Sequence, residues 1–199
     1  MTMSILSPRF QEALRYAVDL HAQDVRKGSG VPYVAHLLSV CGLVLSSGGS
    51  ESEAIAALLH DSLEDHPAEV TKQDLESRFG SEVAAIVVAC TDTGEDYQGG
   101  EKPPWRERKD RYLAHLEHAT PEALRVSLAD KVDNIRAIVA DYRMVGEDLW
   151  SRFKAGREGQ VWYFHSLLQT FESVGANSFL LAELRAGVRA LEELLHPRP

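Results

Sequence analysis

The chain has 199 residues, of which 44% are hydrophobic and 26% are charged, and its formal net charge is −9. This length and composition suit one globular domain with a sizeable core, and no stretch approaches the roughly 18 apolar residues that cross a membrane. The acidic balance argues against binding of a nucleic-acid polymer, which needs a basic surface. Residues 1–8 lack the basic and apolar segments of a secretion signal, so we expect a cytoplasmic protein.

Helical signals follow one another along the chain, and strand signals are almost absent. Caps, first-turn prolines and glycine breakers divide the sequence into helices and one long loop at 92–104. The first expected helix begins at Ser7 and Pro8 and ends before the glycines at 28–30, and the second runs from after Pro32 to about 45. The third begins at Ser50 or Ser52 and includes the run that contains His60. The remaining helices are expected at about 71–79, 81–91, 105–118, 121–142, 147–173, with a break near Gly156 or Gly159, and 177–195. No repeat or linker divides them, so we expect one all-α domain over 1–199, with core motifs at about 10–140 and C-terminal helices at about 147–195.

His60 and Asp61 are adjacent at the end of an apolar run and are followed by Glu64 and Asp65. If the run is helical at about 100° per residue, these four polar side chains share one face and the leucines of the run occupy the opposite face. The three acids would then place like charges together, which destabilises a helix unless a cation is present. The pattern therefore indicates a bound cation, with an acidic helix surface as the alternative.

His36 and Asp130 are two further candidate ligands outside this run. His36 begins a helix, and Asp130 lies with Asn134 on one edge of another helix. With His60 and Asp61 they give two imidazoles and two carboxylates, a mixed set that suits manganese, iron, cobalt or zinc. Their wide separation in sequence leaves a second interpretation open for His36, that of a hydrogen-bonded core histidine.

The other histidines and the C-terminal aromatic residues carry weaker signals. His115 and His118 could add ligands for a second metal, but their spacing of three equally fits an amphipathic helix. Four histidines have no partner that the sequence identifies: His21, His66, His165 and His196. The aromatic residues near the C-terminus, such as Phe153, Tyr163 and Phe164, are expected to pack the last helices together.

The order of these polar residues resembles the His, His-Asp, Asp signature of the HD-domain metal-dependent phosphohydrolases. The residues that carry the resemblance are His36, His60 and Asp61 with Glu64 and Asp65 behind them, and Asp130 with Asn134. The segment from Arg26-Lys27 through Pro32-Tyr33 to His36 narrows it to the RelA/SpoT-type hydrolase domain and the small stand-alone hydrolases of guanosine tetraphosphate. The resemblance covers about 10–140 and implies an all-α HD-domain bundle of roughly 8 to 10 helices with a C-terminal helical extension.

The resemblance also implies a role for each matched residue. One divalent metal, usually manganese in this family and with other first-row ions left open, would be held by His36, His60, Asp61 and Asp130. Glu64 and Asp65 would lie beside a metal-bound water that attacks phosphorus. Arg26 would lie against a guanine base, Lys27 would be its neighbour in the pocket, and Asn134 would contact the nucleotide.

A basic segment precedes the helix that leads to Asp130. Five of the ten residues from Lys102 to Arg111 are basic, in a chain that is acidic overall. Arg106 and Lys109 are three residues apart and share a helical face, so they and Lys102 are candidate contacts to a pyrophosphate. The alternative is a solvated surface, because Glu107 and Asp110 interrupt the basic residues.

The sequence therefore predicts an enzyme, a metal-dependent phosphohydrolase with a small nucleotide as substrate. The favoured reaction is hydrolysis of the 3′-pyrophosphate of guanosine tetra- or pentaphosphate. Ala137 stands where the RelA/SpoT pattern often has threonine, which keeps open a phosphatase for another nucleotide or phosphorylated metabolite. A nucleotide-sensing HD module without turnover is a further alternative, and the sequence leaves the native metal and a homo-oligomeric state open.

Overall fold

The computed structural model describes residues 6–92, 100 and 102–196. Helices dominate this part of the chain, and its only β-type pairing is an isolated bridge between Val25 and Pro32. The elements are α1 (Pro8–Leu20), α2 (Val34–Ser46), α3 (Glu51–Leu59), α4 (Ser62–Asp65), α5 (Lys72–Phe79), α6 (Ser81–Cys90), α7 (Trp105–Leu116), α8 (Pro121–Val145), the 3₁₀ helix η1 (Gly146–Arg152), α9 (Gly156–Ser173) and α10 (Ser178–Leu195). The prediction of an all-α fold is confirmed.

Most helix boundaries follow the local signals in the sequence. Ser7, Thr120 and Asn177 each cap a helix by accepting a hydrogen bond from a backbone N–H of the first turn. The expected break within 147–173 lies between η1 and α9, where Gly156 has a positive φ of 60°. Most of the predicted loop at 92–104 lies outside the described residues.

The stretch around His60 departs from the prediction. The sequence predicts that His60 lies within a helix, and the shared polar face of His60, Asp61, Glu64 and Asp65 assumes that this helix continues; the prediction is wrong in this respect, because α3 ends at Leu59 and α4 begins at Ser62. Two side chains bond to carbonyls of the last turn of α3: His60 Nδ1 lies 2.8 Å from the carbonyl of Ala57, and Ser62 Oγ donates to that of Leu59 at 2.7 Å. Such local side-chain bonds compete with helix continuation, and here they turn the backbone at His60 and Asp61.

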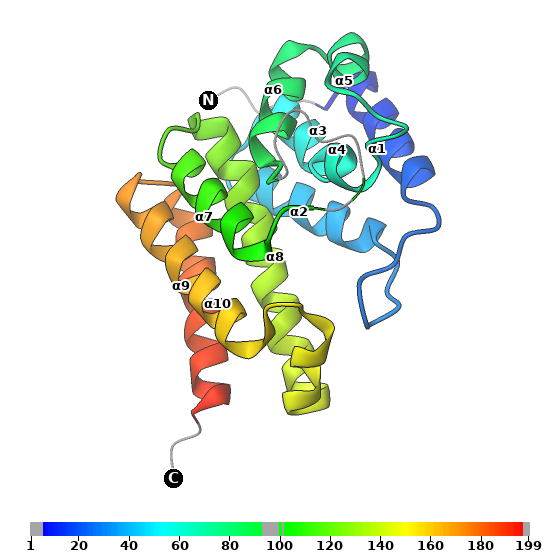
Figure 1. Cartoon of the computed structure of the whole chain (residues 1–199). Helices are drawn as coiled ribbons and strands as arrows, with labels where there is room; N and C mark the ends of the chain where they lie inside the picture. Colours follow the sequence, from blue (N-terminus) through cyan, green and yellow to red (C-terminus); the bar gives the residue numbers. More distant parts are fainter. Residues whose placement is uncertain (1–5, 93–99, 101, 197–199) are drawn as a thin grey trace.

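Helix α8 is the central element of the fold. In Figure 1 it runs obliquely from the upper left to the lower centre of the molecule, with α1 to α6 above and to its right and α7, α9 and α10 to its left. It packs against α2, α3 and α6 and also against η1, α9 and α10. The buried side chains form one hydrophobic cluster that extends from Ala13 in α1 to Leu191 in α10. This continuity supports the single-domain prediction, which stays a prediction.

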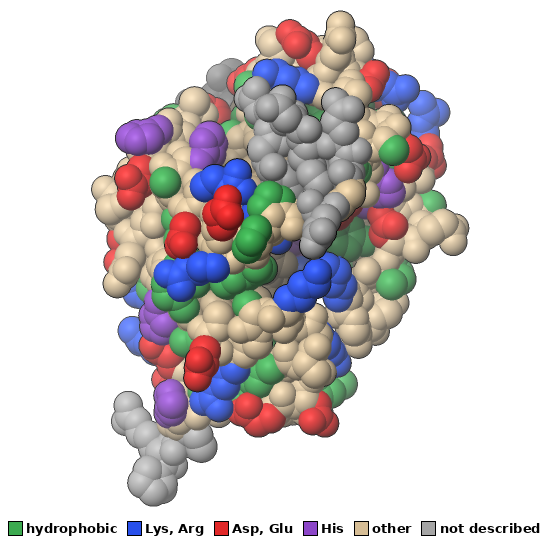
Figure 2. All heavy atoms as spheres, in the orientation of Figure 1, with side chains coloured by type: hydrophobic (Ala, Val, Ile, Leu, Met, Phe, Trp, Pro, Cys, Tyr) green, Lys and Arg blue, Asp and Glu red, His purple; other side chains and the backbone are tan. Residues whose placement is uncertain are grey.

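No helix in the described part of the chain is both long enough and apolar enough to cross a membrane. On the face drawn in Figure 2, basic and acidic side chains are interleaved and do not gather into one patch of a single charge. This is the distribution expected of a chain whose acidic and basic residues pair locally.

Candidate active site

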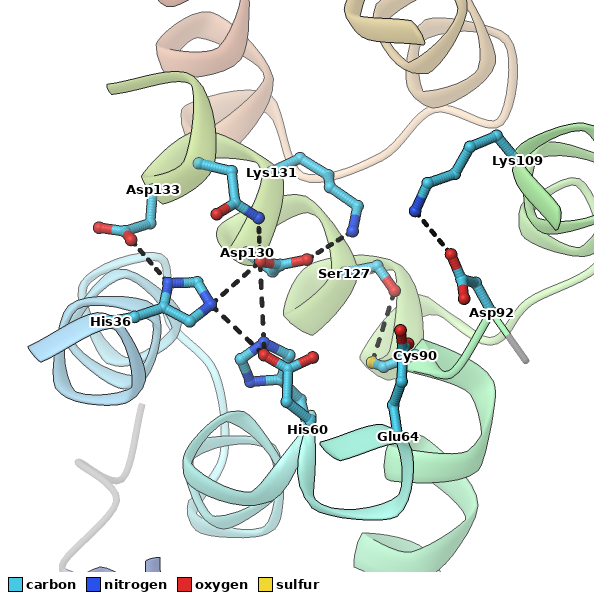
Figure 3. Close-up of polar contacts among 12 residues, drawn as sticks. His36, His60, Glu64, Cys90, Asp92, Lys109, Ser127, Asp130, Lys131 and Asp133 are labelled. Atoms are coloured by element: carbon cyan, nitrogen blue, oxygen red, sulfur yellow. Dashed lines mark hydrogen bonds and ion pairs between the residues drawn. The ribbon is translucent and has the colours of Figure 1, made fainter. Parts of the chain in front are cut away.

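Two histidines and one aspartate converge where α2, the end of α3 and α8 meet (Figure 3). These residues, His36, His60 and Asp130, are here called the floor cluster. The Oδ1 atom of Asp130 lies 3.3 Å from His36 Nε2 and 3.7 Å from His60 Nε2. One ligand atom from each residue lies within 4.8 Å of the other two, and all three side chains are buried. His36 and Asp130 are nearly one hundred residues apart in the sequence, and the packing of α2 on α8 brings them together.

The two imidazoles are oriented so that their Nε2 atoms face the centre of the cluster. His60 Nδ1 lies 2.8 Å from the carbonyl of Ala57, and His36 Nδ1 lies 2.7 Å from Oδ2 of Asp133. These acceptors hold the ring proton on Nδ1 and leave the Nε2 lone pair for a metal. His60 Nε2 is buried and makes no contact with hydrogen-bond geometry among the described residues, although carboxylate oxygens of Asp61 and Asp130 lie 2.9 and 3.7 Å away. The donor set therefore fits a divalent cation.

Asp61 lies beside the floor cluster. Its Oδ2 atom is 2.9 Å from His60 Nε2 and 3.6 Å from His36 Nε2, and it accepts a hydrogen bond from the hydroxyl of Tyr33. Because α4 begins at Ser62, the turn at His60 and Asp61 directs both side chains to the same point. Asp61 is therefore available as a fourth ligand.

The electrostatics of the cluster favour a positive charge at its centre. Burial alone would lower the pKa of His36, but hydrogen bonds to Asp130, Asp133 and Asp61 outweigh it and raise the pKa to about 10. Burial raises the pKa of Asp130, yet Lys131 and the two histidines hold it well below its usual range. Carboxylates that stabilise a proton on an imidazole also stabilise a metal ion that replaces that proton.

Glu64 and Asp65, predicted to act in catalysis, both lie on the cleft above the floor cluster. Glu64 Oε1 accepts a bond of 2.7 Å from Lys102 Nζ. Desolvation in the cleft, together with the charges of Asp61 and Glu64, raises the pKa of Asp65 to about 6, although the residue as a whole is exposed. Asp65 can therefore exchange a proton near neutral pH.

The cleft has a volume of about 830 Å³, which is in the range of sites for small molecules. Five of the six residues predicted to contact substrate line it: Arg26, Lys27, Lys102, Lys109 and Asn134. The lysines Lys27, Lys102 and Lys109 are here called the cationic wall. Arg106 is not among the lining residues, and its guanidinium lies 3.5 Å from the ring centre of Trp162 and pairs with Asp110.

Four basic residues of the cleft already have acidic partners: Arg26, Lys102, Lys109 and Lys131. Arg26 donates to Asp133 at 2.8 Å and to Asn134 Oδ1 at 3.0 Å. Lys109 Nζ lies 2.6 Å from Asp92, which also pairs with Arg108. An anionic ligand would therefore compete with carboxylates for these cations, as Figure 3 illustrates for Lys109 and Asp92.

Sequence reasoning missed several residues of the cleft. Lys131 lines the cleft, is partly buried, and its Nζ lies 2.5 Å from Asp130 Oδ2, whereas Asp133 is not among the lining residues but orients His36. Their places on α8, one and three residues after Asp130, were the only available signal. Phe153, Tyr163 and Phe164 were expected only to pack the last helices, but they line the cleft as well. Nothing in the local sequence indicates that second role, because it depends on how α9 packs on α7.

Comparisons with known proteins agree with this geometry. A family model described as "HD domain" matches residues 13–161. Over 177 residues the chain is 32% identical to the protein named guanosine-3′,5′-bis(diphosphate) 3′-pyrophosphohydrolase MESH1 of Xenopus tropicalis, covering 87% of this chain and 89% of that protein. It is 33% identical over 129 residues to a probable guanosine-3′,5′-bis(diphosphate) 3′-pyrophosphohydrolase of Synechocystis, covering 64% of this chain but only 16% of that longer protein.

A solved structure described as a metazoan ortholog of SpoT that hydrolyses ppGpp and plays a role in starvation responses superimposes with a TM-score of 0.73. Its sequence identity is 27%, and the match covers 94% of this chain and 97% of that chain. The similarity therefore includes the C-terminal helices as well as the segment with the metal-ligand pattern.

Proposed function

The chain belongs to the HD-domain family, and from this premise we propose that it is a hydrolase that removes the 3′-pyrophosphate of guanosine tetra- or pentaphosphate. The observation that carries the proposal is the floor cluster, whose two Nε2 atoms and one carboxylate converge at the bottom of a cleft with a cationic wall. The activity named for the two relatives and the SpoT ortholog supports the choice of substrate.

HD domains bind a divalent metal, and in this chain His36, His60 and Asp130 would hold it together with Asp61. We propose manganese as the native ion, since the set of imidazoles and carboxylates suits it. When bound, such an ion offsets phosphate charge and makes a coordinated water easier to deprotonate.

The two acids above the floor cluster would handle protons. Glu64 and Asp65 would take up the proton that a water loses as it attacks phosphorus. The bond from Lys102 holds the Glu64 carboxylate in place until substrate arrives. This hydrogen bond lies on the cleft surface. A phosphate oxygen can therefore replace Glu64 as the acceptor for the ammonium group of Lys102 when Glu64 accepts a proton.

The remaining cleft residues would bind the nucleotide. Lys27 and Lys109 would contact phosphate oxygens, and Arg26 and Asn134 would contact the nucleoside. Arg26 is held by Asp133 and Asn134, so its guanidinium plane is already fixed before a base stacks on it. Ala137 lines the same cleft and offers no hydroxyl to the nucleotide.

The direct test is release of pyrophosphate from guanosine tetraphosphate by the manganese-loaded protein. We expect turnover by the wild type and none by Asp130→Asn, with equal helical content in both by circular dichroism. Absence of pyrophosphate release at micromolar wild-type protein that contains its metal would contradict the proposed substrate.

Two further measurements separate the alternatives. A screen of phosphorylated nucleotides and metabolites would identify a phosphatase with another substrate. A nucleotide-sensing module would bind nucleotide tightly but release no product. In that case Glu64→Gln would bind nucleotide as tightly as the wild type, and neither protein would show activity. We further propose that the protein is cytoplasmic, that it acts on a small nucleotide, and that residues 1–199 form a single domain. Size-exclusion chromatography would determine whether it forms a homo-oligomer.

A further inference from the structure

A second group of possible metal ligands lies outside the floor cluster, and one of its members, Asp24, lines the cleft. These residues, His21, Asp24 and His66, are here called the rim cluster. His21 is the C-cap of α1, Asp24 follows in the next turn, and His66 is the C-cap of α4. The sequence identified no partner for His21 or His66, but the fold brings the ends of α1 and α4 together.

The ligand atoms of the rim cluster meet at one carboxylate oxygen. Oδ2 of Asp24 lies 2.8 Å from His21 Nδ1 and 2.7 Å from His66 Nε2. With metal–ligand bonds of about 2.1 Å, neighbouring ligand atoms are about 3.0 Å apart at right angles and about 3.4 Å apart in a tetrahedron. The two distances are about 0.2 to 0.3 Å below the right-angle value, so the carboxylate oxygen and the two nitrogens would have to move apart by at least that much to admit an ion.

His66 has the arrangement of a metal-binding histidine whose second nitrogen is anchored. Its Nδ1 atom lies 3.1 Å from Oε1 of Glu69, while Nε2 faces Asp24. A carboxylate that accepts the Nδ1 proton fixes the ring and raises the basicity of Nε2. Glu69 does for His66 what Asp133 does for His36 in the floor cluster.

His21 is suited to bind as a neutral imidazole. Its side chain is fully buried, and its Nδ1 atom faces the carboxylate of Asp24. His21 would bind through Nδ1, the nitrogen that faces Asp24, and its one proton would then lie on Nε2, which is buried and has no hydrogen-bond partner among the described residues. A histidine that carries one proton keeps one lone pair for a metal.

We propose that His21, Asp24 and His66 bind a second divalent ion of the kind that prefers imidazole, with zinc as the probe. The ion would tie the end of α1 to the turn after α4. Tyr33 links this site to the floor cluster, because its ring lies 5.3 Å from that of His21, its backbone N–H donates to the carbonyl of Asp24, and its hydroxyl donates to Asp61. The ion would thus hold Tyr33 and, through it, the position of Asp61.

The test is metal stoichiometry in the full-length protein. Metal-free protein is titrated with zinc, dialysed, and analysed for bound metal in the wild type, His66→Gln, Asp24→Asn and His60→Gln. His66 is partly buried, with 13% of its side chain exposed, and it lies outside the hydrophobic cluster. The matched control is His165→Gln, which removes a surface histidine that pairs with Glu192 at 3.2 Å.

We expect two equivalents of zinc in the wild type and the His165→Gln control, and one in each of His66→Gln, Asp24→Asn and His60→Gln. A wild-type protein with one equivalent, lost in His60→Gln and retained in His66→Gln, would overturn the rim site. Two equivalents in both the wild type and His66→Gln would also overturn it, since the second ion would then lie elsewhere. One equivalent that is lost only in the rim variants would support the rim site and contradict the metal centre of the proposed function.

Discussion

The floor cluster and the cationic wall face the same cleft but are built in different ways. The floor residues come from helices packed in the core, and the rings of His36 and His60 are each held at Nδ1 by a buried acceptor. The wall residues lie on loops and on α7, closer to solvent, and Lys102 and Lys109 are paired with carboxylates that a ligand can replace. The difference suggests that the floor determines the chemical step and that the wall determines affinity.

The largest effect is expected from His60→Gln, which removes one imidazole of the floor cluster. Removal of a residue that only hydrogen-bonds to a metal ligand lowers activity by up to about 100-fold. We expect a larger fall here, because His60 is itself a proposed metal ligand. Bound metal and pyrophosphate release are measured together. If His60→Gln keeps its metal and most of its kcat, the floor cluster does not determine the chemical step as we expect.

Asp133→Asn should have the next largest effect. The carboxylate that accepts the Nδ1 proton of His36 is replaced, and such outer partners contribute about 10- to 100-fold to metal affinity or activity. Manganese affinity is measured by titration of the metal-free protein. The matched control is Glu183→Gln, whose carboxylate also pairs with a side chain of α8, that of Arg136, but on the exposed surface. An equal loss in both variants would indicate general destabilisation of α8.

Lys109→Ala tests the wall. A hydrogen bond to a charged group contributes about 1.5–3 kcal/mol, and 1.4 kcal/mol corresponds to tenfold, so KM should rise at least about tenfold with little change in kcat. Arg108 still pairs with Asp92, so the buried carboxylate keeps a partner in this variant. Steady-state kinetics measure both constants.

Arg106→Ala is the matched control for Lys109→Ala. Both residues lie on α7 one turn apart, but Arg106 is exposed and stacks on Trp162 outside the cleft. We expect its KM to equal that of the wild type. A rise as large as that of Lys109→Ala would mean that the sequence prediction of a phosphate contact at Arg106 is right and that the cleft closes differently with substrate.

The smallest effect is expected from Ser50→Ala, at the capping box that begins α3. Loss of such a cap costs about 1 kcal/mol of stability, and Thr71→Ala removes the equivalent cap of α5. Thermal unfolding of both variants should show similar losses with unchanged kcat. A fall in kcat for Ser50→Ala alone would mean that the cap also positions His60 at the other end of α3.

The departures from the sequence predictions have physical causes. The helix through His60 ends early because His60 and Ser62 bond to carbonyls of its last turn, an outcome that a periodicity of 3.6 residues does not encode. Arg106 and Lys109 share a face of α7, yet only Lys109 reaches the cleft, because Trp162 of α9 lies against Arg106. The contact between α7 and α9 is a property of the packed structure.

The sequence by itself determined the helical fold, most helix boundaries, and the residues of the floor cluster, because caps and apolar periodicity act locally and the His, His-Asp, Asp order is carried by the chain. Only the tertiary structure decided which nitrogen of each histidine faces the centre, that Asp133 and Lys131 support the floor cluster, and that His21 and His66 share Asp24. Apart from the pairing of the neighbours Asp130 and Lys131, these relations join atoms of residues that are three or more positions apart in the sequence. They depend on packing angles and side-chain rotamers that no local pattern in the sequence specifies.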